Sequence, residues 1–465
     1  MKKKIYDVLL VGSGLSSIIF AKEYLKKNSS INIISPDFKK YTNSTSGSLS
    51  NYKALPPQFK KNFKKIDDYF HFNKFKFNKK NCNLLGSLEF GGLSNYWGLQ
   101  MDRNIDDDIK HLSKNTQKDI KNCFLEILKE NLLLGNYETF NNNFKIDYFY
   151  ENLITCIKKN DTHIFEKPII AISSKIKKIN KINRNCIKLT PNDIFKNLDK
   201  KKVIFHNYYV DTITKKNDLI LVKCKNLQQE KSFFTKKIVL ASGTLVTTKL
   251  LMDYFKIKKT IPIKHHPRLI SVYIARNKLL SNLDMTPGLL QIKKNTNNKN
   301  YVGDLRPSNE IILNMALKIF SFLKPLKFIF LLFKDKILFS NNLLGSKYSN
   351  LYMKKNKDKF SIFSKNKKTL LVLKQKQKNI YKFLKEKKLI FSLYKNFFPG
   401  IGADYHYFGT VPIKRSGKLS LNEKCQVNQN KSIYVIDGSA FDFKKNLYPL
   451  GTIIANSKRV AKLIK

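Results

Sequence analysis

Residues 5–17 read IYDVLLVGSGLSS, an apolar run that passes directly into a turn of glycines and serines. The run 5–11 is typical of a buried strand, and residues 18–27 predict a helix with one apolar face. A second strand is expected at 31–34. This order and spacing predict a β-turn-α-β unit that binds a nucleotide, rather than an ordinary turn of an α/β protein.

Each small residue of the turn has a specific role in such a unit. Gly12 permits the tight turn, and Gly14 lets the backbone approach a pyrophosphate at the N-terminus of the helix. Ser17 replaces the third glycine of the pattern and is small enough for close packing of helix on strand. The second strand of such units usually ends in an acidic residue that binds the ribose. Here Ser35 stands at that place, and Asp37 is the alternative ribose ligand.

The charge of the chain is strongly basic, with a formal net charge of +54 over 465 residues. Only seven of its 88 basic residues are arginines, whereas nucleic-acid sites depend on the planar fork of arginine. We therefore expect no nucleic-acid partner. An attraction to anionic surfaces, including membranes, remains open.

The cysteines and the N-terminus bear on the compartment. Six scattered cysteines without metal-ligand spacing indicate reduced thiols and a cytoplasmic protein. Residues 1–4 followed by an apolar run imitate a signal peptide. Because Asp7 interrupts that run and cleavage would delete the nucleotide loop, we expect no signal peptide.

One long apolar segment, Ile311 to Phe339, invites a membrane interpretation. Lys318, Lys324 and Lys327 interrupt it, so it is too charged to span a bilayer. An interfacial helix with peripheral contact at the inner face of a membrane is one reading. A buried core helix or a lid is the favoured one. The lysine-dense stretch 353–387 is expected to be solvated.

Further motifs lie in the middle of the chain. Residues 85–98 hold four glycines and the only tryptophan, with Ser94 and Asn95 beside the pair Gly91-Gly92. Residues 106–134 predict a helix, and 237–244 predict a strand that ends in a turn of small residues, where Gly243 permits a close approach. His265-His266-Pro267 lacks acidic partners nearby in the sequence, so a structural turn is favoured and no metal site is expected.

The C-terminal part adds a histidine and a second turn. His406 precedes the pair Gly409-Thr410, and the strand 433–436 ends in Asp437-Gly438-Ser439. Residues 446–452 read NLYPLGT and lead into a closing helix at 453–464, with Pro449 suited to a first helical turn.

With these motifs in order, the chain resembles the glucose–methanol–choline (GMC) oxidoreductases, FAD enzymes that oxidise alcohols and sugars. Five segments match, namely the N-terminal loop, the Gly91-Gly92 loop, the turn 241–243, His266-Pro267 and the C-terminal pair. The form Gly-Gly-x-Ser-x-x-Trp is most similar to the pyranose-oxidase branch. Residues 268–400 match nothing specific.

The resemblance implies roles for individual residues. His406 takes the place of the catalytic histidine. The second catalytic position falls on Tyr448, a departure from the usual histidine or asparagine, and Asn446 is the alternative. Tyr96 replaces a histidine that carries covalent FAD in some relatives, so non-covalent FAD is implied. The residues placed at the FAD are Gly12, Gly14, Ser17, Ser35, Asp37, Gly91, Gly92, Ser94, Asn95, Val210, Ala241, Gly243, Asp437, Gly438, Pro449 and Thr452.

The expected fold is α/β, with a discontinuous Rossmann-type FAD-binding domain and a substrate domain built on an antiparallel sheet. The first is assigned to residues 1–110, 200–267 and 400–465, and the second to 111–199 and 268–399. The expected function is oxidation of a CH–OH group of a small alcohol or sugar by hydride transfer to flavin, with oxygen or another electron acceptor. The alternative is a flavin-binding, membrane-peripheral protein without this activity.

Overall fold

The computed structural model describes most of the chain, with several gaps. The described residues are 4–37, 74–95, 100–102, 105–130, 133–134, 161–166, 169–171, 190–226, 228–276, 290–294, 301–307, 325, 328, 332, 336–365, 368–414, 416–445 and 447–464.

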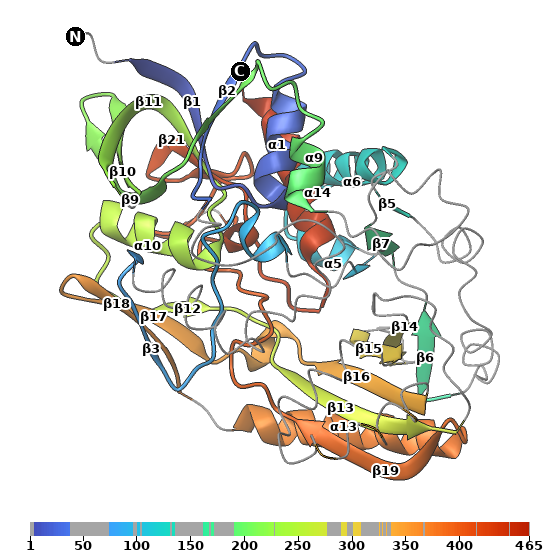
Figure 1. The fold of residues 1–465 in the computed structure, drawn as a ribbon. Coiled ribbons are helices and arrows are strands. Elements are labelled where there is room, and N and C mark those ends of the chain that lie inside the picture. Colours follow the sequence, from blue (N-terminus) through green and yellow to red (C-terminus); the bar gives the residue numbers. More distant parts are fainter. Residues whose placement is uncertain are drawn as a thin grey trace.

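A largely parallel sheet forms the upper part of the molecule (Figure 1). Its parallel strands, in spatial order, are β21 (Asn430–Val435), β11 (Glu230–Leu240), β1 (Ile5–Val11), β2 (Ile31–Ile34) and β8 (Val203–His206). Three antiparallel strands complete it, β20 (Gln426–Val427) beside β21, and β9 (Tyr209–Lys216) and β10 (Leu219–Lys225) extending from β11. Because β1 is central and apolar, its residues from Val8 to Val11 are buried.

Helices pack around this sheet. α1 (Leu15–Tyr24) lies beside α14 (Leu450–Leu463), which also contacts α6 (Lys114–Lys129). The others are α5 (Asp106–Ile109), α9 (Pro191–Phe195) and α10 (Thr244–Tyr254). α1 begins three residues before the predicted helix and buries nine of its ten residues. The expectation of a single apolar face was therefore wrong, because α1 is buried on nearly all sides, with α9 and α14 among its neighbours.

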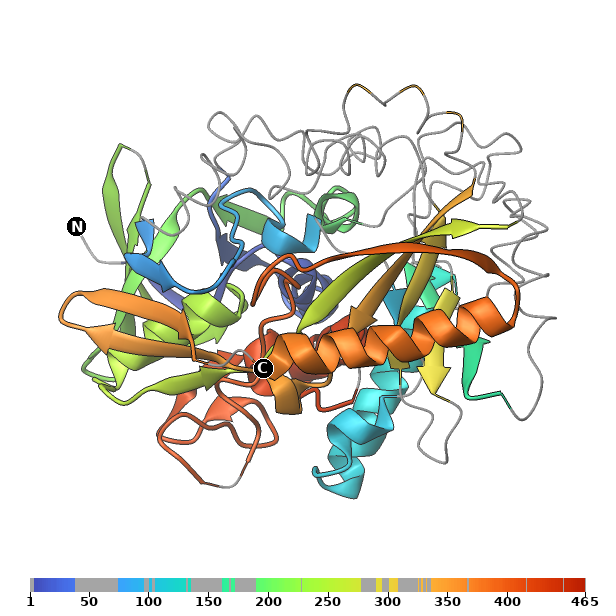
Figure 2. The ribbon, with the colours of Figure 1, turned by 90° about the horizontal axis from the view of Figure 1, so that it is seen from below.

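An antiparallel sheet forms the lower part, covered by a long helix (Figure 2). Its order is β19 (Ile390–Phe397), β13 (Arg268–Ala275), β16 (Ile337–Leu343), β15 (Tyr301–Pro307), β14 (Leu290–Lys294) and β6 (His163–Glu166). α13 (Lys368–Glu386) packs on β13, β16 and β19. A four-stranded sheet joins β12 (Ile261–Ile263), β17 (Leu351–Asn356), β18 (Lys359–Ser364) and β3 (Phe77–Lys80).

The remaining elements are short. A three-stranded sheet holds β4 (Gln100–Met101), β7 (Ile169–Ala171) and β5 (Leu133–Leu134). Single 3₁₀ turns are η4 (Gly92–Asn95), η8 (Ser346–Tyr348) and η9 (Gly438–Ala440).

The predicted class is confirmed: a Rossmann-type α/β unit joined to an antiparallel sheet. All strands of the upper sheet come from the three segments 1–110, 200–267 and 400–465. The four-stranded sheet mixes β3 and β12 from those segments with β17 and β18 from 268–399. The domain boundaries stay a prediction.

Three local expectations differ from the structure. The single helix predicted for 106–134 is broken, because Ser113 caps a new helix by accepting the Thr116 amide. The stretch 353–387 is only partly solvated, since α13 buries one face that includes Leu373 and Ile380. Most of Ile311 to Phe339 lies outside the described residues, and its last three residues begin strand β16 instead of continuing a helix. Among the described helices, none has the length and apolar character of a transmembrane span.

Candidate active site and dinucleotide cradle

Gly12 makes the turn after β1 possible. Its φ is +111°, and a Cβ there would lie 2.2 Å from the carbonyl oxygen of Ala241. The Gly12 amide donates to the Ile34 carbonyl at 2.8 Å. A residue with a side chain therefore fits neither the backbone conformation nor the packing between β1 and β11.

The N-terminus of α1 faces the Gly91-Gly92 loop. Gly14 is the N-cap residue and offers no side-chain cap, while Ser94 Oγ accepts the Leu15 amide at 3.1 Å. A Cβ on Gly14 would lie 3.2 Å from that oxygen. Ser17 is fully buried and donates to the Gly12 carbonyl at 2.6 Å, so its hydroxyl fastens the turn to the helix.

Ser35 and Asp37 follow β2 and approach the same loop. The hydroxyls of Ser13 and Ser35 share a hydrogen bond of 2.7 Å, and Ser13 Oγ also accepts the Gly91 amide at 2.9 Å. Asp37 Oδ1 accepts the Phe90 amide at 3.4 Å. Both candidate ribose ligands thus lie beside the loop, at the carboxyl end of β2.

Two further glycines leave open space. Gly92 and Gly243 have φ values of +50° and +82°, and a Cβ at either would meet nothing within 4 Å. Asn95 fixes the loop by donating from Nδ2 to the Phe90 carbonyl at 2.7 Å. Val210 is buried in β9. These loops and the N-terminus of α1, here together called the cradle, lie at the carboxyl ends of β1, β2 and β11.

The turn after β21 links the cradle to His406. Asp437 accepts the Thr247 hydroxyl at 2.5 Å and the Ser439 amide at 3.0 Å, and burial raises the pKa of its carboxyl group. A Cβ on Gly438 would lie 2.9 Å from the Tyr407 carbonyl. Because only a glycine allows the Tyr407 carbonyl to approach so closely, Tyr407, the residue after His406, packs directly against the turn.

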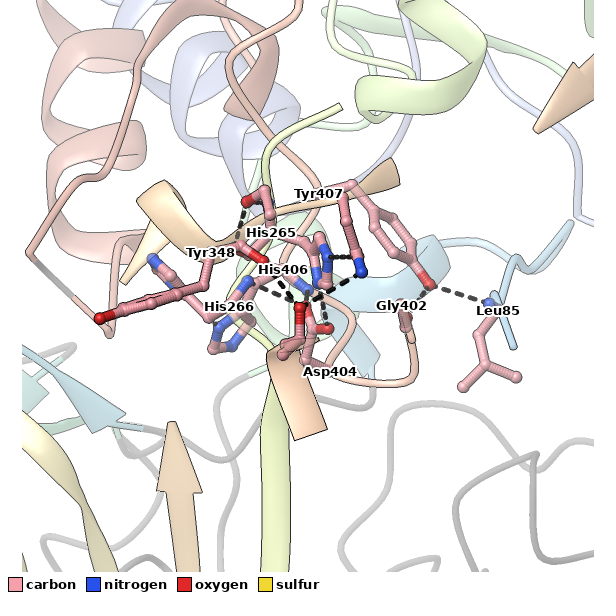
Figure 3. Close-up of polar contacts among 11 residues, drawn as sticks. Leu85, His265, His266, Tyr348, Gly402, Asp404, His406 and Tyr407 are labelled. Carbon is pink, nitrogen blue, oxygen red and sulfur yellow. Dashed lines mark hydrogen bonds and ion pairs between the residues drawn. The ribbon is translucent and has the colours of Figure 1, made fainter. Parts of the chain in front are cut away.

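Three histidines and one aspartate lie close together around His406 (Figure 3). The Nδ1 atoms of His266 and His406 lie 3.2 Å apart. His265 donates from Nδ1 to Asp404 Oδ2 at 2.8 Å, and Asp404 Oδ1 accepts the His406 amide at 3.1 Å. Asp404 is almost fully buried, and it ties the segment before β13 to the loop that carries His406.

Burial controls the charge of these groups. It lowers the pKa of His266 to about 3 and that of His406 to about 4, and the Asp404 carboxylate only partly offsets the effect. Burial by itself would raise the pKa of Asp404, but His265 and the other histidines hold it below the ordinary value. Near neutral pH the pair His266–His406 is therefore uncharged.

The hydrogen bonds also fix which nitrogen of His406 carries the proton. His266 Nε2 lies 3.0 Å from the Phe443 carbonyl, which only accepts, so this nitrogen carries hydrogen. A neutral His266 then has a lone pair on Nδ1, and His406 donates to it from its own Nδ1. Nε2 of His406 is consequently left unprotonated and able to act as a base.

Tyr448 belongs to a second polar cluster. Its hydroxyl donates to Asp304 Oδ2 at 3.1 Å, and Arg306 Nε donates to Asp304 Oδ1 at 2.6 Å. Burial raises the pKa of the Tyr448 phenol well above its ordinary value. The charge of Asp304 reaches His406 and raises its pKa slightly against the effect of burial. Asn446, the alternative second residue, lies outside the described residues, as does Tyr96.

The two predicted cofactor residues at the start of α14 make hydrogen bonds within the protein. Pro449 is the N-cap of α14, and its carbonyl accepts the Ile453 amide at 3.2 Å. Thr452 is fully buried and donates to Asp108 Oδ2 at 2.6 Å. These contacts position the start of α14.

Sequence reasoning missed part of the site. His265-His266-Pro267 is no isolated turn, because Asp404 and His406, far along the chain, supply the partners. Asp404 stands only two residues before His406, but it was not assigned a role from the sequence. Asp304 and Arg268 had no local signal. Within the described residues no cluster of His, Cys, Asp and Glu is arranged to hold a metal.

Comparisons with known proteins give the fold. No family model matches the chain. No curated protein sequence matches it either. A solved structure, pyridoxine 4-oxidase from Mesorbium loti, shares the fold with a TM-score of 0.61 and 10% identity, over 98% of this chain and 99% of that one.

Proposed function

We propose that the chain is an FAD-dependent oxidoreductase of the GMC type that oxidises a CH–OH group. The observation that carries the proposal is the neutral His266–His406 pair, with Nε2 of His406 unprotonated, fixed to the turn beside the cradle. The shared fold with an oxidase, pyridoxine 4-oxidase, supports the reaction class.

The cradle fits a dinucleotide such as FAD. Gly92 and Gly243 leave room where a Cβ would stand, and the N-terminus of α1 has no cap from its own N-cap residue. Helix N-termini attract phosphates because their first amides lack intrahelical partners. Ser439 Oγ, fully buried, has no hydrogen-bond partner among the described residues and is a further polar group in the turn. Ser35 or Asp37 would hold the ribose.

The protein's own residues supply orientation and proton transfer. Bound FAD would supply the hydride acceptor for the carbon of the alcohol. His406 Nε2 takes the hydroxyl proton, and the hydrogen bond to His266 keeps the ring in the required tautomer. Asp404 holds the backbone of His406, so the base keeps its place.

The Tyr448 phenol is suited to binding the substrate through a hydrogen bond and not to abstracting its proton. With its pKa raised, the phenol stays protonated, and its hydrogen points at Asp304. The oxygen still has a lone pair that can accept a hydrogen bond from a substrate hydroxyl.

The purified protein is expected to be yellow, and acid should release intact FAD, because the proposed binding is non-covalent. Anaerobic mixing with a panel of alcohols and sugars should bleach the flavin absorbance with at least one member. A yellow protein that no member bleaches would favour the flavin-binding protein without this activity. A colourless protein that does not take up FAD would contradict the proposed function.

Tyr448→Phe should reduce the rate of flavin reduction about 10- to 100-fold. It removes one hydrogen bond to Asp304 Oδ2, which keeps its bond from Arg306 Nη2 at 3.1 Å, and it removes one substrate contact worth about 1–3 kcal/mol. Stopped-flow reduction measures this change. Tyr434→Phe is the matched control, since that hydroxyl accepts from Gln426 at 3.0 Å on β21. Equal losses in both variants would mean that the Tyr448 hydroxyl has no particular role at the site.

A further inference from the structure

Arg268, two residues after His266, has no anionic partner in the part of the chain that the structure describes. It is the first residue of β13. Its guanidinium carbon lies 5.1 Å from the centre of the Tyr405 ring, directly before His406. Within the described ranges its buried Nε has no hydrogen-bond partner, and no carboxylate there forms an ion pair with it. Its charge reaches His406 and lowers the pKa of that ring.

The nearby acids are already committed to other groups. Asp404 is bound by His265 and by the amide of His406. Asp304 is held by Arg306 through two hydrogen bonds of 2.6 and 3.1 Å. The two arginines therefore differ: Asp304 compensates the charge of Arg306, whereas no carboxylate of the described residues compensates that of Arg268.

Tyr405, whose ring faces the guanidinium, has an unusual backbone conformation. Its φ is +66°, an uncommon value for a residue with a bulky side chain. Such conformations persist where the surrounding structure imposes them, often at ligand sites. Here the Tyr405 ring packs against the Arg268 guanidinium, one residue before His406, and a planar oxyanion would satisfy the unpaired nitrogen.

We propose that Arg268 binds an oxyanion group of the substrate, a carboxylate or a phosphate monoester, so that the alcohol oxidised at His406 is an acidic one. The inference rests on the proposed oxidation but concerns a different residue. It names the substrate class and makes Arg268 a specificity-determining residue.

The test uses the FAD-loaded protein and two matched pairs of alcohols. Glycolate is compared with ethylene glycol, and glycerol 3-phosphate with glycerol, at constant ionic strength. The acidic member of at least one pair should reduce the flavin about 10- to 100-fold more efficiently than the neutral member, the gain expected of a charge-assisted hydrogen bond. The pair that shows the preference distinguishes carboxylate from phosphate.

Variants distinguish the effect of the Arg268 guanidinium group from the effect of the positive net charge of the protein. Arg268→Gln should abolish the preference, and Arg268→Lys should restore part of it. Arg276→Gln is the control, because Arg276 also stacks on an aromatic ring, Phe391 at 5.3 Å, but follows the far end of β13. It should keep the full preference. A preference that survives in Arg268→Gln, or that is absent from the parent while neutral alcohols react, overturns the inference and leaves the oxidation standing.

A binding measurement covers the case in which no alcohol bleaches the flavin. Glycolate and inorganic phosphate are then titrated while thermal unfolding of the FAD-loaded parent, Arg268→Gln and Arg276→Gln is followed. An increase in unfolding temperature that is lost only in Arg268→Gln supports the oxyanion site although the oxidation has failed. Identical curves for the three proteins overturn it.

Discussion

Flavin reduction by an alcohol substrate is expected to slow by about 10²–10⁴-fold in His406→Asn, the usual contribution of general base catalysis. The FAD content and the fold should be unchanged. The amide nitrogen of asparagine stands near the place of Nδ1 and can donate the same hydrogen bond to His266. What the variant lacks is a basic nitrogen at the position of Nε2. Anaerobic stopped-flow absorbance gives the rate, and its dependence on alcohol concentration gives the binding constant.

A second histidine provides the control for this change. His206 is partly buried in β8, and burial lowers the pKa of its ring as well. It lies 3.1 Å from Asn32 Oδ1, in the sheet and away from the Asp404 cluster. His206→Asn should reduce its flavin at the parental rate. If His406→Asn does the same, His406 is structural and the proposed mechanism is wrong.

The pH dependence of the parent follows from the same burial. A base must be neutral, and His406 becomes protonated only as the pH approaches its lowered pKa of about 4. The rate of flavin reduction should therefore stay level as the pH falls through 6.5, the ordinary pKa of histidine, and decline only nearer 4. A decline centred on 6.5 would mean that the base is exposed to water.

The parts of the fold that were predicted correctly depend on local chemistry. Strands β1 and β2 were placed at their observed bounds, because uninterrupted apolar runs next to a glycine turn leave few alternatives. The class of the second sheet was also correct, although residues 268–400 offered no specific motif. The start of α1 was placed too late, since Leu15, Ser16 and Ser17 read as loop while the glycine cap lay just before them.

The site could be predicted only where it is local in sequence. Glycines of the cradle and His406 stand in short motifs. By contrast, His265 meets Asp404 across 139 residues, and Tyr448 meets Asp304 across 144. No periodicity in one sequence reports such pairs, because they depend on how β13, β15 and the C-terminal loops assemble. The same limit applies to Arg268, because only the assembled structure shows that its Nε has no partner among the described residues.

The last expected result concerns the cradle: Gly14→Val should fold but bind FAD roughly 10²-fold more weakly, or worse. Gly14 has an ordinary φ of −67°, so valine meets no backbone strain. Its Cβ, however, would already lie 3.2 Å from Ser94 Oγ, and the branched methyl groups would extend between that loop and the N-terminus of α1. Losing one or two hydrogen bonds to a pyrophosphate, each worth about 1.5–3 kcal/mol, gives an effect of this size.

Two comparisons make this result specific. Gly12→Val should fail to fold, because its φ of +111° and the 2.2 Å approach of the Ala241 carbonyl leave no place for a side chain. Ser29→Val, an exposed position beyond the other end of α1, should bind FAD like the parent. FAD affinity is measured by fluorescence titration of the apoprotein, and circular dichroism reports folding. Parental affinity in Gly14→Val would show that the phosphates do not approach α1, because valine cannot share that space with them.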